Sequence, residues 1–156
     1  MKIREANAED IESIKLIIDR NFDEVISQYH SAAIVNKFKE HNSVENLKSQ
    51  LGWKKIYVAA EENGQVVGTG AFANFGTAES PKYSVSNLYV LPEWHRKGIG
   101  AKILEILIGD AQKRNADTLH VPSTRNGVAF YEKFGFAIDK IQPDIDDEIT
   151  WMTKEL

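Results

Sequence analysis

The apolar residues of this chain recur with two spacings, one typical of helices and one typical of strands. Helical spacing begins after Asn7, whose side chain is suited to cap the first turn as an N-cap. The apolar positions of this predicted helix are Ile11, Ile14, Ile17, Ile18, Phe22 and Val25. Helical structure is also predicted over 30–51 with a break near 40–43, where Asn42 and Glu45 are spaced as a capping box.

Two shorter helices are expected in the second half of the chain. Residues 101–111 are amphipathic, and their apolar face consists of Ile103, Leu104, Leu107, Ile108 and Ala111. Residues 127–134 form the other helix, and Gly135 suits the left-handed position that commonly ends a helix.

Strands are expected where β-branched and aromatic residues cluster between turn residues. The stretch 55–75 predicts a β-hairpin, because Asn63 and Gly64 suit a type I′ turn in which both central residues have positive φ. An acidic turn over 142–147 joins the last two predicted strands. The strands outside the hairpin are 2–6, 82–91, 118–122, 136–141 and 148–156.

The resulting order, β-α-α-β-β-β-α-β-α-β-β, predicts the α/β (α+β) class with one sheet. Hairpins produce antiparallel neighbours and helix-linked strands produce parallel ones, so the sheet is expected to be mixed, with helices packed on it. A length of 156 residues suits a single domain spanning 1–156.

Composition excludes several classes of function. Net charge is −4, so the chain has no overall basic field for nucleic acid, and no apolar run approaches the ~20 residues of a membrane span. Cysteine is absent, which excludes disulfides and thiolate nucleophiles, and the four histidines have no metal-ligand spacing. We therefore expect a cytoplasmic protein with no metal, no nucleic-acid partner and no membrane partner.

The segment HRKGIGA (95–101) joins a predicted strand to a predicted helix. A helix that begins at Gly98 or Ile99 leaves several backbone N–H groups without partners, and the helix dipole adds positive potential there. Glycine at 98 and 100 lets an anion approach the backbone, and Arg96, Lys97 and Lys102 add charge. The alternative is an ordinary strand-to-helix turn with solvated cations. Neither a P-loop nor a complete dinucleotide fingerprint is present.

Two motifs resemble those of the GNAT superfamily of N-acetyltransferases. LYVLPEWHRKGIGAKIL (88–104) is similar to its acyl-CoA-binding motif, [R/Q]-x-x-G-x-[G/A], and VAFYEKFGF (128–136) is similar to its tyrosine helix ending in Gly-Phe. His95 replaces the usual Gln or Arg, at a position that contributes mainly its backbone. Thr124 replaces a common Asn before the tyrosine helix. The resemblance implies a GNAT-like domain whose central sheet is mixed, mostly antiparallel and about seven-stranded, with helices on both faces.

The resemblance also implies an N-acetyltransferase that moves an acetyl group from acetyl-CoA to a primary amine of a small molecule or peptide. The pantetheine arm would lie beside Leu88, Tyr89 and Val90 and contact Thr124 or Asn126. An N–H of Leu88 or Val90 would stabilise the oxyanion, and Tyr131 would be the general acid. The pyrophosphate would bind the backbone amides of Arg96, Lys97, Gly98, Ile99, Gly100 and Ala101.

The general base and the acceptor stay open. No carboxylate occurs on the strand before the glycine segment, and the alternatives are Glu79, Tyr83, Glu148, or water relayed by Ser86 or Asn87. The part of the family fold that usually walls the acceptor pocket would here contain Tyr29, His30, Phe38 and Trp53. The rival functions are a non-catalytic acyl-CoA-binding sensor or interaction module and an unrelated nucleotide- or phosphate-binding protein. The chain could be a monomer or a homodimer.

Overall fold

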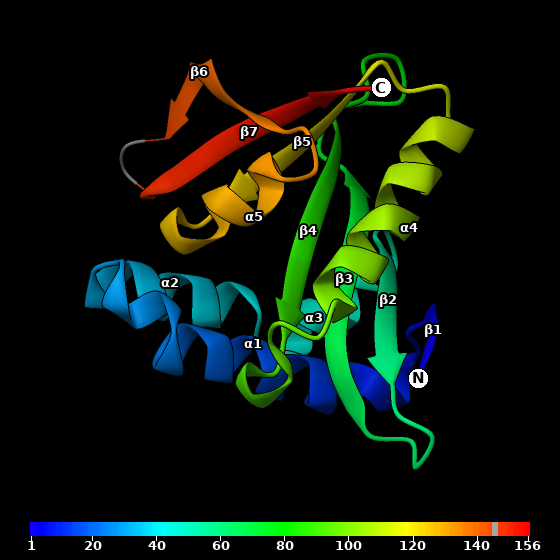
Figure 1. The fold of residues 1–156 in the computed structure, drawn as a ribbon, viewed down its shortest axis with the longest axis vertical. Helices are drawn as coiled ribbons and strands as arrows, with labels where there is room; N and C mark the ends of the chain where they lie inside the picture. The colour runs from blue at the N-terminus through cyan, green and yellow to red at the C-terminus, as the bar shows by residue number, and fades with distance from the viewer. Residues whose placement is uncertain (145–146) are drawn as a thin grey trace.

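The computed structural model describes residues 1–144 and 147–156, which form one seven-stranded sheet flanked by helices (Figure 1). The strand order is β1-β2-β3-β4-β5-β7-β6, and only β4 and β5 are parallel neighbours. The mixed, mostly antiparallel sheet predicted from the sequence is thereby confirmed. The strands are β1 (Lys2–Glu5), β2 (Lys55–Ala60), β3 (Val66–Asn74), β4 (Tyr83–Val90), β5 (Thr118–Ser123), β6 (Ala137–Asp144) and β7 (Ile149–Glu155).

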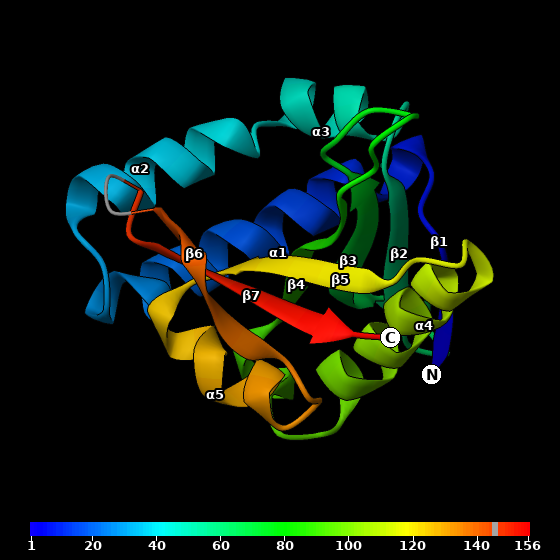
Figure 2. The same ribbon diagram turned by 90° about the horizontal axis from the view of Figure 1, so that it is seen from above.

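Helices cover both faces of the sheet, as Figure 2 shows from above. On one face α1 packs against β3 and β4, with α2 and α3 beyond it; on the other α4 packs against β2, β3 and β4, and α5 lies beside it. The helices are α1 (Ile11–Glu24), α2 (Ala32–His41), α3 (Val44–Gln50), α4 (Ile99–Lys113) and α5 (Val128–Glu132). Short 3₁₀ turns are η1 (Ala8–Asp10), η2 (Ile26–Gln28), η3 (Pro92–Trp94) and η4 (Arg125–Gly127).

The core lies where the apolar faces of α1 and α4 meet the sheet. Asn7 is an N-cap as predicted, and it accepts a hydrogen bond from Glu9 N at the start of η1, which leads into α1. On the opposite face α4 lies so close to β3 that a Cβ at Gly70 would be 2.5 Å from Ile103 Cγ2. Glycine at 70 therefore sets how near α4 can approach the sheet.

The parallel pair β4–β5 separates along its length, and this separation shapes the site described below. Ser84 with His120 is the single residue pair in register between the two strands in the described part of the chain. On its other side β4 carries a bulge, because Thr69 pairs with Tyr89 but Ala71 pairs with Ser86, and Asn87 in the bulge has a φ of 52°. The bulge, which bends its strand locally, lies beyond Ser84 toward the end of β4 where no described residue is in register with β5.

Three local expectations were wrong. The β2–β3 hairpin exists, but the described non-glycine residues with positive φ do not include Asn63, so the turn is not type I′. Instead Gly64 alone is left-handed, at φ 90°, and its N–H donates to Glu61 O across the turn (2.9 Å). The predicted Asn42–Glu45 capping box is also wrong. Ser43 is extended and caps α3 by accepting from Asn46 N (3.1 Å), while the Asn42 side chain donates to Phe38 O.

The third concerns the end of the chain. β6 continues to Asp144, three residues beyond its predicted end, because residues 143 and 144 pair with Thr150 and Ile149 of β7. Residues 145–146 of the predicted acidic turn lie outside the described residues. Partners in a sheet supply backbone hydrogen bonds to polar residues as readily as to apolar ones, so polarity alone did not mark where this strand ends.

Candidate functional site

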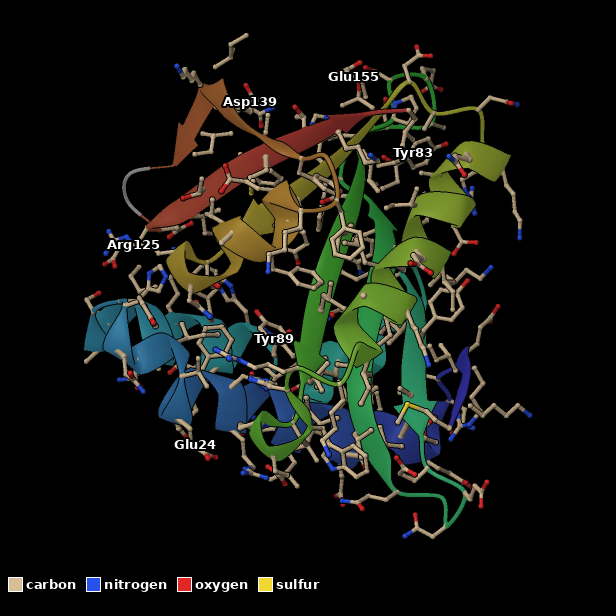
Figure 3. All side chains as sticks on the ribbon, viewed as in Figure 1. Glu24, Tyr83, Tyr89, Arg125, Asp139 and Glu155 are labelled. Atoms are coloured by element: carbon tan, nitrogen blue, oxygen red, sulfur yellow. The ribbon has the colours of Figure 1, made fainter. Side chains whose placement is uncertain are left out.

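A cavity of about 770 Å³ opens where β4 and β5 separate. Its walls come from β4, the β4–α4 loop, the start of α4, the end of β5, η4 and α5, and from α1 and α2 on the opposite side. Tyr89, labelled in Figure 3, lies in the space between α1 and α5. The predicted site residues that line this cavity are Leu88, Tyr89, Val90, His95, Arg96, Gly98, Ile99, Gly100, Ala101, Thr124, Asn126 and Tyr131.

The glycine loop, residues 96–101, presents a row of unpaired backbone amides. The first helical bond at this end of α4 is donated by Lys102 N to Gly98 O (3.1 Å), and none of the amides of 96–101 has an acceptor among the described residues. Gly98 is left-handed (φ 81°), and a Cβ built on it meets nothing within 4 Å. The loop is thus an open, positively polarised surface suited to an anion.

The basic side chains of this segment differ in whether they line the cavity. Arg96 lines the cavity, whereas Lys97 lies over the Trp94 ring at 5.2 Å and Lys102 is exposed, so neither lysine forms part of the cavity wall. The His95 amide differs from those after it, because it donates to Pro92 O (3.2 Å). The amides that remain for a ligand begin at Arg96.

β4 presents backbone groups to the cavity beside this loop. Leu91 N donates to Val67 O (2.8 Å), so the Leu91 amide points to β3, and alternation along the strand directs the Val90 amide to the open side. The Val90 carbonyl, on that open side, accepts from Asn21 Nδ2 (2.8 Å) and His95 Nε2 (2.7 Å). These two side chains hold the end of β4 in place.

Tyr131 on α5 is buried, and its ring packs edge-on against Phe130 and Phe136. Its hydroxyl has no hydrogen-bond partner in the described part of the chain, although the side chain lines the cavity. Burial raises the pKa of Tyr131 well above its ordinary value, and neighbouring Tyr89 raises it further. The phenol therefore stays protonated near neutral pH, in the state of a proton donor.

Thr124 and Asn126 lie on the opposite wall, where β5 leads into α5. Thr124 is the residue that precedes η4, and Ser123 Oγ donates to its carbonyl (2.7 Å). Both side chains line the cavity, so the loop that contains them faces β4 across the cavity.

Of the candidates for a general base, only some line the cavity. Glu79 is exposed outside the cavity, and Tyr83 lines a different pocket of about 560 Å³; Figure 3 labels Tyr83 at the end of β4 remote from Tyr89. Glu148 is held by Ser31 Oγ (2.8 Å) and His30 Nδ1 (3.2 Å) and does not line the cavity. Ser86 and Asn87 do line it.

The residues expected to wall an acceptor pocket are also dispersed. Phe38 lines the cavity, whereas Trp53 lines the pocket that contains Tyr83. Tyr29 and His30 line neither, and the His30 side chain is enclosed with Glu148 and Arg125, whose N–H donates to His30 Nε2 (3.0 Å). Figure 3 labels Arg125 on the side of the molecule toward α2.

Sequence reasoning missed Lys54, which lines the cavity just before β2 begins. Its Nζ donates to Ser86 Oγ (2.9 Å) and lies over the rings of Trp53 (5.0 Å) and Phe75 (5.5 Å). Burial lowers the pKa of Lys54 to about 8. Nothing in the sequence separates Lys54 from Lys55 beside it, because Ser86 and Phe75 are distant along the chain.

A family model described as an acetyltransferase (GNAT) domain matches residues 23–155. The chain belongs to the GNAT acetyltransferase family. Membership places it among the acyltransferases. No curated protein matches the chain.

Solved GNAT structures share the fold over nearly the whole chain. The PaiA N-acetyltransferase of Thermoplasma acidophilum, solved with coenzyme A, is 22% identical with a TM-score of 0.80, over 99% of this chain and 98% of that one. A GNAT-family acetyltransferase of Staphylococcus aureus Mu50 is 17% identical with a TM-score of 0.77, over 99% and 98%. The ribosomal-protein-alanine N-acetyltransferase of Brucella melitensis is 22% identical with a TM-score of 0.69, over 100% of both chains.

No helix among the described residues is both long enough and apolar enough to cross a bilayer. Within the same residues, no group of three or more His, Asp or Glu side chains is arranged to hold a metal ion.

Proposed function

We propose that this chain transfers an acetyl group from acetyl-CoA to a primary amine by direct attack in a ternary complex. The observation that carries the proposal is the continuity of one cavity, which joins the unpaired amides of 96–101 to the Tyr131 hydroxyl. The first element suits a diphosphate, and the second suits proton transfer to a leaving group. Family membership and the coenzyme A in the T. acidophilum structure support this assignment.

The glycine loop fits the diphosphate of coenzyme A. A Cβ at Gly100 would lie 3.5 Å from Phe130 Cζ and a Cβ at Gly98 would meet nothing within 4 Å, and both glycines line the cavity. In the proposed complex the amides from Arg96 to Ala101 donate to the diphosphate, while Leu88, Tyr89 and Val90 lie beside the pantetheine arm. Thr124 and Asn126 offer polar groups to that arm from the opposite wall.

The chemistry assigns one task to each wall. Bound acetyl-CoA supplies a thioester, whose C–S bond breaks as the C–N bond to the amine forms. The Val90 or Leu88 amide donates to the carbonyl oxygen as negative charge develops there. Tyr131, kept protonated by burial, donates its proton to the departing sulfur. The protonated amine must first lose a proton, which water held by Ser86 and Asn87 can accept. The second proton that the nitrogen loses as the amide forms restores the one that Tyr131 gives to sulfur.

A tyrosine pair in the same cavity tests the assignment. Tyr131→Phe should lower kcat by about 100-fold while the Kd for acetyl-CoA changes little, because general-acid catalysis contributes to the chemical step alone. Tyr89→Phe is the matched control, since it removes a hydroxyl from the same cavity. Thiol release with a panel of amines measures turnover, and calorimetry measures binding.

Two outcomes would contradict the proposal. Loss of turnover in Tyr89→Phe but not in Tyr131→Phe would show that Tyr131 is not the general acid. Tight coenzyme A binding without thiol release from any amine would instead favour the non-catalytic acyl-CoA-binding module.

A further inference from the structure

Lys54 occupies the end of the cavity remote from the glycine loop. It is bonded to Ser86, which precedes the β4 bulge, whereas the glycine loop follows the end of β4 at Val90. Ser86 pairs with Ala71 and Val90 pairs with Gly68, so the two positions lie three residues apart along β3, or roughly 10 Å at ~3.3 Å per residue. If the diphosphate binds at the loop, Lys54 lies on the side from which an acceptor enters.

The Lys54 ammonium lacks a counter-ion. Among the described residues, Nζ has one hydrogen-bond acceptor, Ser86 Oγ, and no carboxylate within salt-bridge distance. Lys54 is half-buried, and a lysine withdrawn from water normally has an anionic partner. The neighbouring Lys55 has two such partners, Glu5 and Asp110, each at 3.6 Å. Lys54 lies instead over two aromatic rings, those of Trp53 and Phe75.

A chain of hydrogen bonds holds Lys54 toward the cavity. Ser86 Oγ, which accepts from Lys54, donates to Asn87 Oδ1 (3.2 Å), and Asn87 Nδ2 donates to Gln50 Oε1 (2.7 Å). Each hydrogen bond in this series runs away from Lys54, and Ser86 accepts only one of the three ammonium N–H groups. The other N–H groups remain available to a ligand. The left-handed Asn87 belongs to the bulge itself, which ties the position of Lys54 to the geometry of β4.

The charge of the cavity wall is one-sided. None of the described residues that line the cavity is Asp or Glu. Its lining does include three basic residues, Lys54, Arg96 and Lys133. An acceptor with a second cationic group would find no anionic partner here. An acceptor with an anionic group would supply the one that Lys54 lacks.

We infer that Lys54 binds a carboxylate of the acceptor, so the acceptors are amines that also carry a carboxylate, such as free amino acids. This inference rests on the proposed acetyl transfer and names its substrate class. Lys54 is then a specificity-determining residue whose ammonium pairs with the end of the acceptor that does not react.

Matched substrates and matched variants test the inference. Wild-type enzyme should acetylate a free amino acid with a kcat/KM about 10–100-fold above that of its carboxamide, the range expected for one charge-assisted hydrogen bond. Lys54→Met should remove this preference, mainly through the KM of the carboxylate substrate, whereas any effect transmitted through Ser86 would lower kcat for both substrates equally. Lys55→Met is the control outside the cavity wall and should keep the preference.

Lys54→Arg separates anion binding from proton abstraction. An arginine binds carboxylates but cannot act as a base at neutral pH, so the inference predicts that Lys54→Arg retains most of the preference. Melting temperature and coenzyme A affinity report whether each variant is folded.

The other possible outcomes contradict either the inference about Lys54 or the proposed function. Equal loss with both substrates in Lys54→Met, not rescued by arginine, would show a base in place of an anion site. A wild-type enzyme that acetylates carboxamides as well as amino acids would overturn the inference and leave the proposed function intact. No turnover of any amine would overturn the proposed function and the inference with it.

Discussion

Substitution of Gly100 by glutamate separates ligand binding from folding in one step. Gly100 is the second residue of α4, and a Cβ there would meet Phe130 Cζ at 3.5 Å, Phe130 Cε1 at 3.7 Å and Val90 Cγ2 at 3.9 Å. These are ordinary van der Waals distances, so the protein accepts a side chain at 100. The carboxylate would extend from the row of amides that we assign to the diphosphate.

The expected energies have opposite signs. Replacing a helical glycine by a better helix former gains about 0.5 kcal/mol, and an acid in the first turn adds about 0.3–1 kcal/mol through the helix dipole. Against this, two unit charges about 4 Å apart repel by about 4 kcal/mol at an effective dielectric constant near 20. Allowing for side-chain rotation, a loss of about 2–4 kcal/mol corresponds to about 30- to 1,000-fold weaker coenzyme A binding.

Calorimetry measures this loss, and Gly109→Glu is the matched control. Gly109 lies in the same helix, a Cβ there meets nothing within 4 Å, and the residue does not line the cavity. Gly109→Glu should therefore bind coenzyme A like the wild type. A folded Gly100→Glu protein with unchanged coenzyme A affinity would refute the assignment of the glycine loop.

Three other predictions follow from packing and charge. Gly70→Ala should lower the free energy of unfolding by about 1–3 kcal/mol in urea denaturation, because its Cβ would lie 2.5 Å from Ile103 Cγ2; an unchanged midpoint would refute the close approach of α4. Burial lowers the pKa of His30 below its unfolded value near 6.5, so stability present above that pH should fall as the pH decreases, and more steeply than in His30→Gln; parallel pH profiles would refute this. The preference for a carboxylate over a carboxamide acceptor should decline as the pH rises through about 8, where Lys54 loses its proton among groups that do not titrate, Ser86 and two aromatic rings; a constant ratio would contradict it.

Patterns that depend on neighbouring residues predicted much of the fold. Helical spacing located α1 and α4, and the unpaired amides that the glycine loop was expected to offer are present from Arg96 onward. These features depend on local torsions and on a helix's own geometry, so they can be predicted from a short stretch of sequence. Twelve of the predicted site residues also line one cavity, because they follow motifs on adjacent elements.

Features set by competition or by distant contacts were not predictable in the same way. Ser43 and Asn42 are both suitable N-cap residues. Ser43 caps α3 because Asn42 is already the C-cap residue of α2. The β2–β3 turn needed one left-handed residue rather than two, which Gly64 supplies. Lys54 is functional in our account only because Ser86 and Phe75 surround it, and no spacing rule connects residues so far apart.

The central claim is that the amides of the glycine loop hold the diphosphate of the acyl donor. Titration of ¹⁵N-labelled protein with coenzyme A, followed by amide chemical shifts, tests it directly. The largest changes should occur at the amides from Arg96 to Ala101, with smaller ones at Leu88 and Val90, while His95, whose amide is already bonded to Pro92, moves less. Saturable binding with the main shifts elsewhere in the protein, or no binding at millimolar coenzyme A, would contradict the account.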